Sequence, residues 1–322
     1  MKNRPWVRPL FFALLLYLAI QGLVRYEVIN PYWHQVTQYS LIVTISSLGL
    51  NIIYGYTGQF SLGHAAFFGI GAYSSALLVK TLKMESPVIF VLCLLLGALL
   101  AGLVAFLVGL PILRLRSDYL GIATLGFGII VKVALDNLDG LIPMMGGSRG
   151  MSGIPKLTNF TLIYLFALLA VILLRNFIDS SHGRACISIR EDEIAAETMG
   201  INTTKYKTIA FVMGCCYAGL AGGLYAHLYV FLHPSNFDFL KSFDPLLIVV
   251  LGGLGSMSGT IIAAIGWTFL LEGLRVLLPP QILDWRMVIY PVLLIVVMLL
   301  RPQGLFGGSE FAFLRPRRGI PE

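Results

Sequence analysis

GRACISIREDEIAAETMGINTTKYK, residues Gly183–Lys207, is the stretch that decides how this chain is organised. It lies between two long apolar runs, and no other internal segment of the sequence carries charge at such a density. Hydrophobic residues make up 57% of the 322 residues and charged residues only 12%. A soluble domain needs a larger share of charged residues, because its surface faces water. The composition therefore predicts a membrane protein with a single domain, residues 1–322, that leaves one short helical segment in water.

The polar segment predicts one discrete amphipathic helix. Ser188 and Glu191 have the spacing of a capping box, in which each side chain satisfies a free backbone amide at the helix start. Acidic residues at 191–193 then occupy the first turn, where the helix dipole favours them, and Gly200 is suited to end the helix in the left-handed conformation. The expected length is about 11 residues, and one face is formed by Ile194, Ala195, Thr198 and Met199.

A helix of this length is marginal on its own in water. Its apolar face must lie on the protein's own surface, on lipid headgroups or in the groove of a partner protein. The residues alone leave these three alternatives open.

Apolar runs of about 20 residues, the length that crosses a bilayer, predict about ten transmembrane helices and so an all-α polytopic bundle. The runs fall at residues 9–25, 38–56, 59–79, 87–113, 119–136, 160–176, 206–231, 243–257, 259–278 and 286–300. Basic residues cluster at the ends of these runs, and the positive-inside rule then places both termini, the loop at about 177–206 and the basic tail at about 301–322 in the cytoplasm. Lys241 falls at the outer end of a span in this arrangement.

The segment Tyr54–Tyr73, YGYTGQFSLGHAAFFGIGAY, is too rich in glycine and polar residues for a uniform lipid-facing helix. Irregular backbone at membrane depth is tolerated where protein or a water-filled cavity satisfies it, so the segment indicates either a discontinuous helix beside a pathway or a short turn between two ordinary helices. In the first case the candidate pathway residues are Asn51, Gln59, Ser61 and His64.

Several other patterns narrow the function. The glycine-rich run Val249–Gly259 lacks the order of a phosphate-binding loop, and no Walker A lysine follows it. The four cysteines lack metal-ligand spacing and are expected to be buried apolar residues. The basic residues form no nucleic-acid groove, so the net charge of +7 indicates membrane topology. We expect no cofactor, no metal and no catalytic residue.

Two further features concern structure more than chemistry. Lys132 with Asp136, and Glu272 with Arg275, have helical spacing and are expected to pair with each other near span ends. The long loop Asn137–Pro155 is rich in glycine and proline and is expected to be either a docking surface for an external partner or a plain connector.

At this point the sequence resembles a known family. GLNIIYGYTGQFSLGHAAFFGIGAY at Gly49–Tyr73 is similar to the signature of branched-chain amino acid ABC transporter permeases. Matching blocks follow in the same order, and the chain looks like the larger, M-type permease of such an importer. The blocks are YLGIATLGFG at Tyr119–Gly128, GGSRGMSGIP at Gly146–Pro155, GRACISIREDEIAAETMGIN at Gly183–Asn202, AFVMGCCYAGLAGGLYA at Ala210–Ala226, VVLGGLGSMSGT at Val249–Thr260 and RPQGLFG at Arg301–Gly307.

The resemblance implies a subunit without catalytic activity in a bacterial inner-membrane importer for leucine, isoleucine and valine. It implies four kinds of contact: a second homologous permease, two cytoplasmic ATP-binding subunits, an external substrate-binding protein and the lipid bilayer. It also implies that the segment docking on the ATPase contains Arg190, Glu191, Asp192, Glu193, Ala195, Ala196, Glu197 and Gly200. The alternatives are a permease of the same type for urea or short amides, or an ion-coupled secondary transporter.

Overall fold

The computed structural model describes residues 7–277 apart from Val28, 83–85 and 114–116, and beyond these residues 292, 295–296, 299–301, 303–306 and 310. The described part of the chain is helical and contains no strand beyond an isolated antiparallel bridge between Met151 and Leu232. Its α-helices are α1 (Val7–Arg25), α2 (Pro31–Leu50), α3 (His64–Leu82), α4 (Pro87–Ile112), α5 (Ser117–Asn137), α6 (Phe160–Asp179), α7 (Ser181–Glu191), α8 (Glu193–Thr198), α9 (Thr203–Tyr229), α10 (Phe243–Gly252) and α11 (Met257–Leu277).

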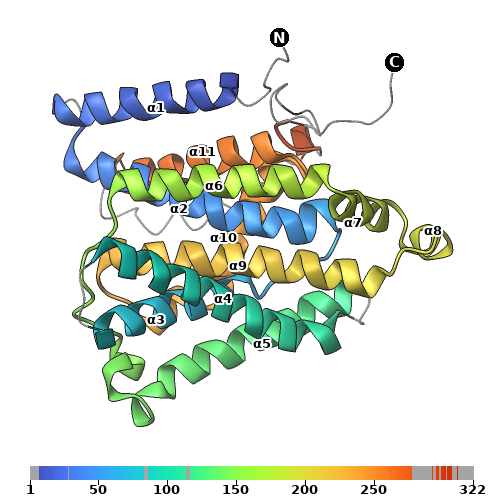
Figure 1. The fold of residues 1–322 in the computed structure, drawn as a ribbon, viewed down its shortest axis with the longest axis horizontal. Coiled ribbons are helices and arrows are strands. Elements are labelled where there is room, and N and C mark those ends of the chain that lie inside the picture. The colour runs from blue at the N-terminus through green and yellow to red at the C-terminus, as the bar shows by residue number, and fades with distance from the viewer. Residues whose placement is uncertain are drawn as a thin grey trace.

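The long helices form one bundle with two distinct ends. Figure 1 shows α7 and α8 beyond one end of the bundle, the α8 end, and the segment between α5 and α6 at the opposite end, the loop end. Three short 3-10 turns, Leu138–Gly140, Pro143–Met145 and Gly147–Arg149, shape the loop end. Helix α1 lies along α6: Tyr17 of α1 bonds Thr161, and Ala13 of α1 accepts from Tyr164. The two helices are therefore antiparallel, and the Val7 end of α1 points toward the α8 end.

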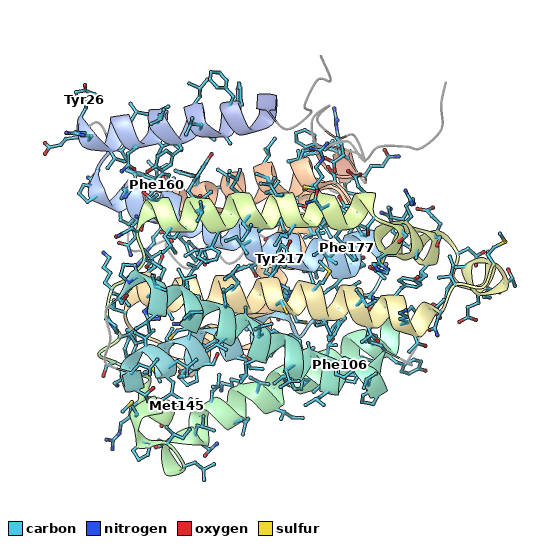
Figure 2. All side chains as sticks on the ribbon, viewed as in Figure 1. Tyr26, Phe106, Met145, Phe160, Phe177 and Tyr217 are labelled. Atoms are coloured by element: carbon cyan, nitrogen blue, oxygen red, sulfur yellow. The ribbon has the colours of Figure 1, made fainter. Side chains whose placement is uncertain are left out.

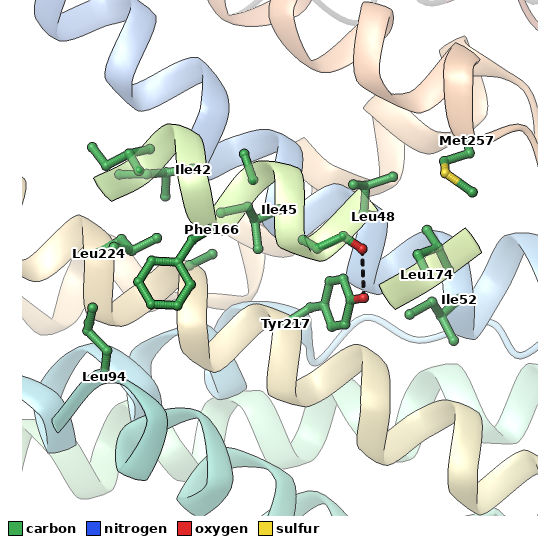
Figure 3. Packing of buried hydrophobic residues seen from close by; sticks show 14 of the residues in the cluster. Ile42, Ile45, Leu48, Ile52, Leu94, Phe166, Leu174, Tyr217, Leu224 and Met257 are labelled. Atoms are coloured by element: carbon green, nitrogen blue, oxygen red, sulfur yellow. Dashed lines mark hydrogen bonds between the residues drawn. The ribbon is translucent and has the colours of Figure 1, made fainter. Parts of the chain in front are cut away.

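Helix α9 lies inside the bundle and packs against α2, α3 and α4. Its glycines permit backbone contact: Gly214 meets the carbonyl of Gly49 in α2, and Gly222 meets the carbonyl of Phe68 in α3. Small residues at four-residue spacing allow such approach. The remaining space is filled by apolar side chains of α2, α6 and α9, as Figure 3 shows around Tyr217, whose hydroxyl donates to the carbonyl of Ala170 over 2.9 Å.

The outer surface differs from this interior. Large apolar side chains are exposed along α1 and α4, for example Phe12 and Leu99, which suits a surface facing lipid. Tyr26, at the end of α1, points away from the bundle, whereas Tyr217 is enclosed by it (Figure 2). The four cysteines are free, and three of them are buried, as expected for small apolar residues.

Two helices begin in the middle of the bundle. His64, the first residue of α3, donates from its ring Nε2 to the carbonyl of Ser46 over 2.9 Å, and Ser46 lies in the interior of the 26-residue helical span Pro31–Tyr56. The amide of Ala65 in turn donates to the hydroxyl of Ser242 over 3.0 Å, directly before α10. The N-termini of α3 and α10 therefore meet at mid-bundle.

The segment 230–242 enters the bundle from the loop end to reach this point. The hydroxyl of Tyr73 donates to the carbonyl of Leu232, Gly69 packs on the ring of Phe237, and Ala65 bonds Ser242. These contacts step along α3 toward its N-terminus, so the segment runs antiparallel to α3. It is a re-entrant segment, the kind of backbone that membrane proteins tolerate where protein surrounds it.

The helix prediction holds for the fold class, whereas the count of about ten is not confirmed by the residues that the structure describes. Seven helices in the described part of the chain are long and apolar enough to cross a membrane, and Phe11–Arg25 is a shorter apolar stretch. The predicted span 243–257 is wrong as a full crossing, because α10 has 10 residues and begins at mid-bundle. The predicted span 286–300 falls largely outside the described residues. The predicted pairs Lys132–Asp136 and Glu272–Arg275 are confirmed, with N–O distances of 3.3 and 3.5 Å.

The close packing of α9 on α3 predicts that Gly222→Ala destabilises the protein. A Cβ atom at this position would overlap the carbonyl oxygen of Phe68, and overpacking of this kind costs about 1–3 kcal/mol. Thermal unfolding in detergent should show a lower midpoint. Gly266→Ala in α11 is the matched control, because nothing lies within 4 Å of its added Cβ. An unchanged midpoint for Gly222→Ala would contradict the α3–α9 contact.

Candidate functional site

The polar segment at the α8 end contains two helices, not one. Asp192 has an extended backbone and separates α7 from α8, and its Oδ1 accepts from the amides of Ile194 and Ala195 over 2.9 and 3.0 Å. Asp192 is therefore the N-cap of α8. The predicted capping box is wrong, because Ser188 lies inside α7 and its hydroxyl donates to the carbonyl of Ala185.

The predicted end of the helix at Gly200 is confirmed. Gly200 has a φ of +84°, and the amide of Ile201 donates to the carbonyl of Ala196, as in a Schellman motif. Thr203 at the start of α9 also donates its hydroxyl to Oε1 of Glu197 over 2.7 Å. Helix α8 is thus held at both ends although it has only six residues.

One side of α8 is not covered by any residue that the structure describes. Ala196 is buried, but Ile194 is 76% exposed and Met199 is 82% exposed. Figure 1 shows α8 as the element that projects farthest beyond the bundle at this end. Exposed apolar side chains on a capped, projecting helix are typical of a surface that another protein covers.

Arg190 ties this surface to the interior of the bundle. Its Nη1 donates to the carbonyl of Gly55 over 2.7 Å, and its stem packs on Gly58. Gly55 lies in the π-helical extension of α2, Asn51–Tyr56. Glu193, the first residue of α8, forms an ion pair with Lys207 of α9.

A polar cleft of about 640 Å³ lies between these elements. Gln59 enters it from the irregular segment after α2, and its Nε2 donates to the carbonyl of Lys207 over 3.1 Å. Four of the predicted coupling residues also line the cleft: Arg190, Glu191, Asp192 and Glu193. The structure therefore gathers these four residues and Gln59 at one place.

Asn51 fixes the turn between α10 and α11 from inside the bundle. Its Nδ2 donates to the carbonyl of Ser256 and to the hydroxyl of Thr260 over 3.1 and 3.0 Å, and its Oδ1 accepts from the amide of Gly255 over 3.1 Å. The residue is fully buried. All of these contacts are made within the chain, so Asn51 holds the turn.

A central cavity of about 650 Å³ lies where α3 and α10 begin. Among the four predicted pathway residues, His64 lines this cavity and Gln59 lines the polar cleft, whereas Asn51 and Ser61 line neither. The cavity also takes side chains from α2, α9 and α11 that the sequence analysis did not single out: Tyr39, Val43, Ser46, Tyr225, Trp267, Thr268 and Leu271.

An ion pair stands at the edge of the central cavity. Lys241 Nζ lies 2.6 Å from Oδ2 of Asp244, and both residues line the cavity. The sequence analysis assigns Lys241 to the outer end of a span, because it treats 243–257 as a full crossing. The i,i+3 spacing of two opposite charges at the start of an apolar run is the signal that could have identified the pair.

The buried thiol nearest the α8 end is unsuited to catalysis. Burial raises the pKa of the Cys186 thiol to about 11, and a hydrogen bond with Thr57 only partly opposes this shift. The thiol therefore stays protonated at neutral pH, and the thiolate is the reactive form.

Comparison with known proteins agrees with this arrangement. Residues 32–298 match the family model described as "Branched-chain amino acid transport system / permease component". The chain belongs to this family. It is 36% identical over 300 residues to the LivM permease of Salmonella typhimurium, covering 83% of this chain and 68% of that one. It is 28% identical to LivH of Escherichia coli, covering 82% and 91%, and 23% identical to a probable LivM of Methanocaldococcus jannaschii, covering 81% and 89%.

No solved structure matches the chain significantly. Membership of the branched-chain amino acid permease family confirms the resemblance found in the sequence, including the likeness to the M-type chain. Family members are membrane components of ABC transporters and carry no catalytic activity of their own. The family and the apolar helices together indicate a multi-pass inner-membrane protein that works with a second permease.

The buried contacts of Asn51 predict that Asn51→Leu destabilises the α10–α11 turn. Each buried backbone group left without a partner costs about 1–3 kcal/mol, so amide hydrogen exchange at 253–256 should accelerate and the unfolding temperature should fall. The matched control is Asn137→Leu, because Asn137 is exposed and its side-chain amide donates to the carbonyl of Val133 in its own helix. Unchanged exchange in Asn51→Leu would show that Asn51 does not hold the turn.

Proposed function

We propose that this chain is the membrane-spanning permease subunit of an ATP-driven importer that translocates leucine, isoleucine and valine. An external binding protein delivers the amino acid, a second homologous permease completes the pathway, and two cytoplasmic subunits hydrolyse ATP. Family membership supports the substrate class. The observation that carries the coupling role is α8, a capped helix that projects from the bundle with Ile194 and Met199 exposed.

In this proposal α8 and the adjoining residues form the docking surface for the ATP-binding subunit. The segment consists of Arg190, Glu191, Asp192, Glu193, Ala195, Ala196, Glu197 and Gly200. Movement of the docked subunit reaches the bundle through Arg190, whose guanidinium bonds Gly55 at the end of α2. The ion pair of Glu193 with Lys207 carries the same movement to α9.

The α8 end is then the cytoplasmic end of the protein. Two observations support this orientation: basic residues favour the same side as the segment 177–206, and the Val7 end of α1 points toward the α8 end. The N-terminus is cytoplasmic in this orientation, and so is the basic tail 301–322. The loop end, with its segment 138–155, faces the external binding protein.

Uptake measurements test the substrate and the energy source together. A strain that lacks this chain should take up less labelled leucine, and the plasmid-borne chain should restore uptake. Urea uptake should be unchanged. Leucine uptake that follows the ion gradient and persists without ATP would indicate a secondary transporter, and restored urea uptake would indicate an amide permease.

The docking assignment predicts that removing the exposed apolar side chains of α8 leads to loss of the ATP-binding subunit. The double variant Ile194→Ser/Met199→Ser should weaken association at least about tenfold, since each buried side chain of this size contributes about 1.5–3 kcal/mol. Copurification in detergent measures the retained subunit. Leu141→Ser is the matched control, because Leu141 is 83% exposed at the opposite end.

Neutralising Glu191–Glu193 should weaken the same contact through its charges. Retention of the ATP-binding subunit at wild-type levels in both α8 variants would overturn the docking assignment.

A further inference from the structure

The central cavity contains opposite charges at a depth where charge is costly. Lys241 and Asp244 pair at its edge, next to Ser242, which bonds the first turn of α3 at mid-bundle. Lys241 is exposed on this chain and Asp244 is half-buried. Ionisable groups at this depth avoid lipid and face protein or water-filled space, so the pair indicates that the cavity opens toward the transport pathway.

His64 adds an acceptor without a partner. Its ring is 1% exposed and lines the cavity. Nε2 carries the proton, because it donates to the carbonyl of Ser46 and a carbonyl only accepts. Nδ1 is then an acceptor, and it has no hydrogen-bond partner in the described part of the chain. A buried polar atom without a partner is costly and indicates a place where a ligand donor fits.

The remaining wall is apolar. Val43, Phe68, Pro245, Trp267 and Leu271 line it from four different helices. The volume of about 650 Å³ includes the open mouth of the cavity, so the site is an open pocket that a ligand can enter from outside. A few placed polar groups on a mostly apolar wall fix the orientation of a ligand and select its apolar part.

We propose that the central cavity is a binding site for a zwitterionic amino acid with a branched aliphatic side chain. Lys241 binds the α-carboxylate, Asp244 and Nδ1 of His64 accept from the α-ammonium group, and the side chain packs on Val43, Trp267 and Leu271. This inference rests on the proposed function and makes the permease itself selective, in addition to any selection by an external binding protein.

The pair explains why the ligand should be a zwitterion. Lys241 and Asp244 cancel each other's charge, and a zwitterion placed between them forms two ion pairs in place of one without adding net charge. A cationic or anionic amino acid would add one uncompensated charge. Urea lacks both charges and cannot fill the apolar wall.

Leucine and two analogues that each lack one charged group test the proposal. The analogues are 4-methylpentanoate, without the ammonium group, and 3-methylbutylamine, without the carboxylate. The complete transporter is purified with Asn236, at the exposed rim of the cavity, replaced by cysteine as a probe. Protection of this thiol from alkylation measures binding without ATP hydrolysis.

Leucine should protect the thiol, and urea, lysine and both analogues should protect it at least about tenfold less well. Asp244→Asn should abolish the preference for leucine over 4-methylpentanoate, and Lys241→Gln should abolish the preference over 3-methylbutylamine. If the ion pair were purely structural, neither substitution would remove its particular ligand preference. The control Lys132→Gln/Asp136→Asn removes an ion pair that lines neither cavity and should leave the protection profile unchanged.

The outcomes separate the two proposals. The cavity assignment alone would be overturned if the wild type takes up leucine but Asp244→Asn and Lys241→Gln both keep the wild-type protection profile. Failure of the wild type to take up leucine would overturn the proposed function. Leu271→Trp, which narrows the cavity, should abolish protection while the ATP-binding subunit stays bound, and undiminished protection would also count against the site.

Discussion

Backbone hydrogen bonding away from water is the constraint on which this structure depends. A chain that starts helices at mid-bundle leaves amides and carbonyls that lipid cannot satisfy. Here side chains from distant elements satisfy two of these amides: Ser242 accepts from Ala65, and Thr124 of α5 accepts from Leu62. Each bond joins segments far apart in the sequence. The interrupted helices and the packing around them therefore stabilise each other.

The same bonds connect the two candidate sites. Helix α10 begins at the central cavity and ends at the turn that Asn51 holds. Asn51 opens the π-helical extension of α2, and Gly55 in that extension accepts from Arg190 of α7. The path from the cavity to the α8 end therefore consists of one ten-residue helix and two polar clamps, a buried one at Asn51 and a part-buried one at Arg190. Such clamps transmit displacement because neither partner can leave without losing its hydrogen bonds.

The sequence predicted those features that depend on residues close together in the chain. Gly200 predicted where α8 ends, and the spacing of Lys132 and Asp136 predicted their pair. The helix break at Asp192 was missed because Ser188 fits a capping pattern equally well. The half-length of α10 was missed because 243–257 is mostly apolar despite Asp244, and only contacts with α3 reveal its depth. The place of His64 and Gln59 in two different cavities likewise depends on long-range packing.

The meeting of α3 and α10 has an electrostatic consequence of its own. Both helices start at the cavity and run in opposite directions, so their positive dipole ends, each worth about half an elementary charge, face one another. Like-signed ends repel, and this repulsion is largest when nothing lies between them. An anionic group in the gap would relieve it. Asp244, in the first turn of α10, already supplies such a group, so the fold itself meets part of this electrostatic cost before any ligand arrives.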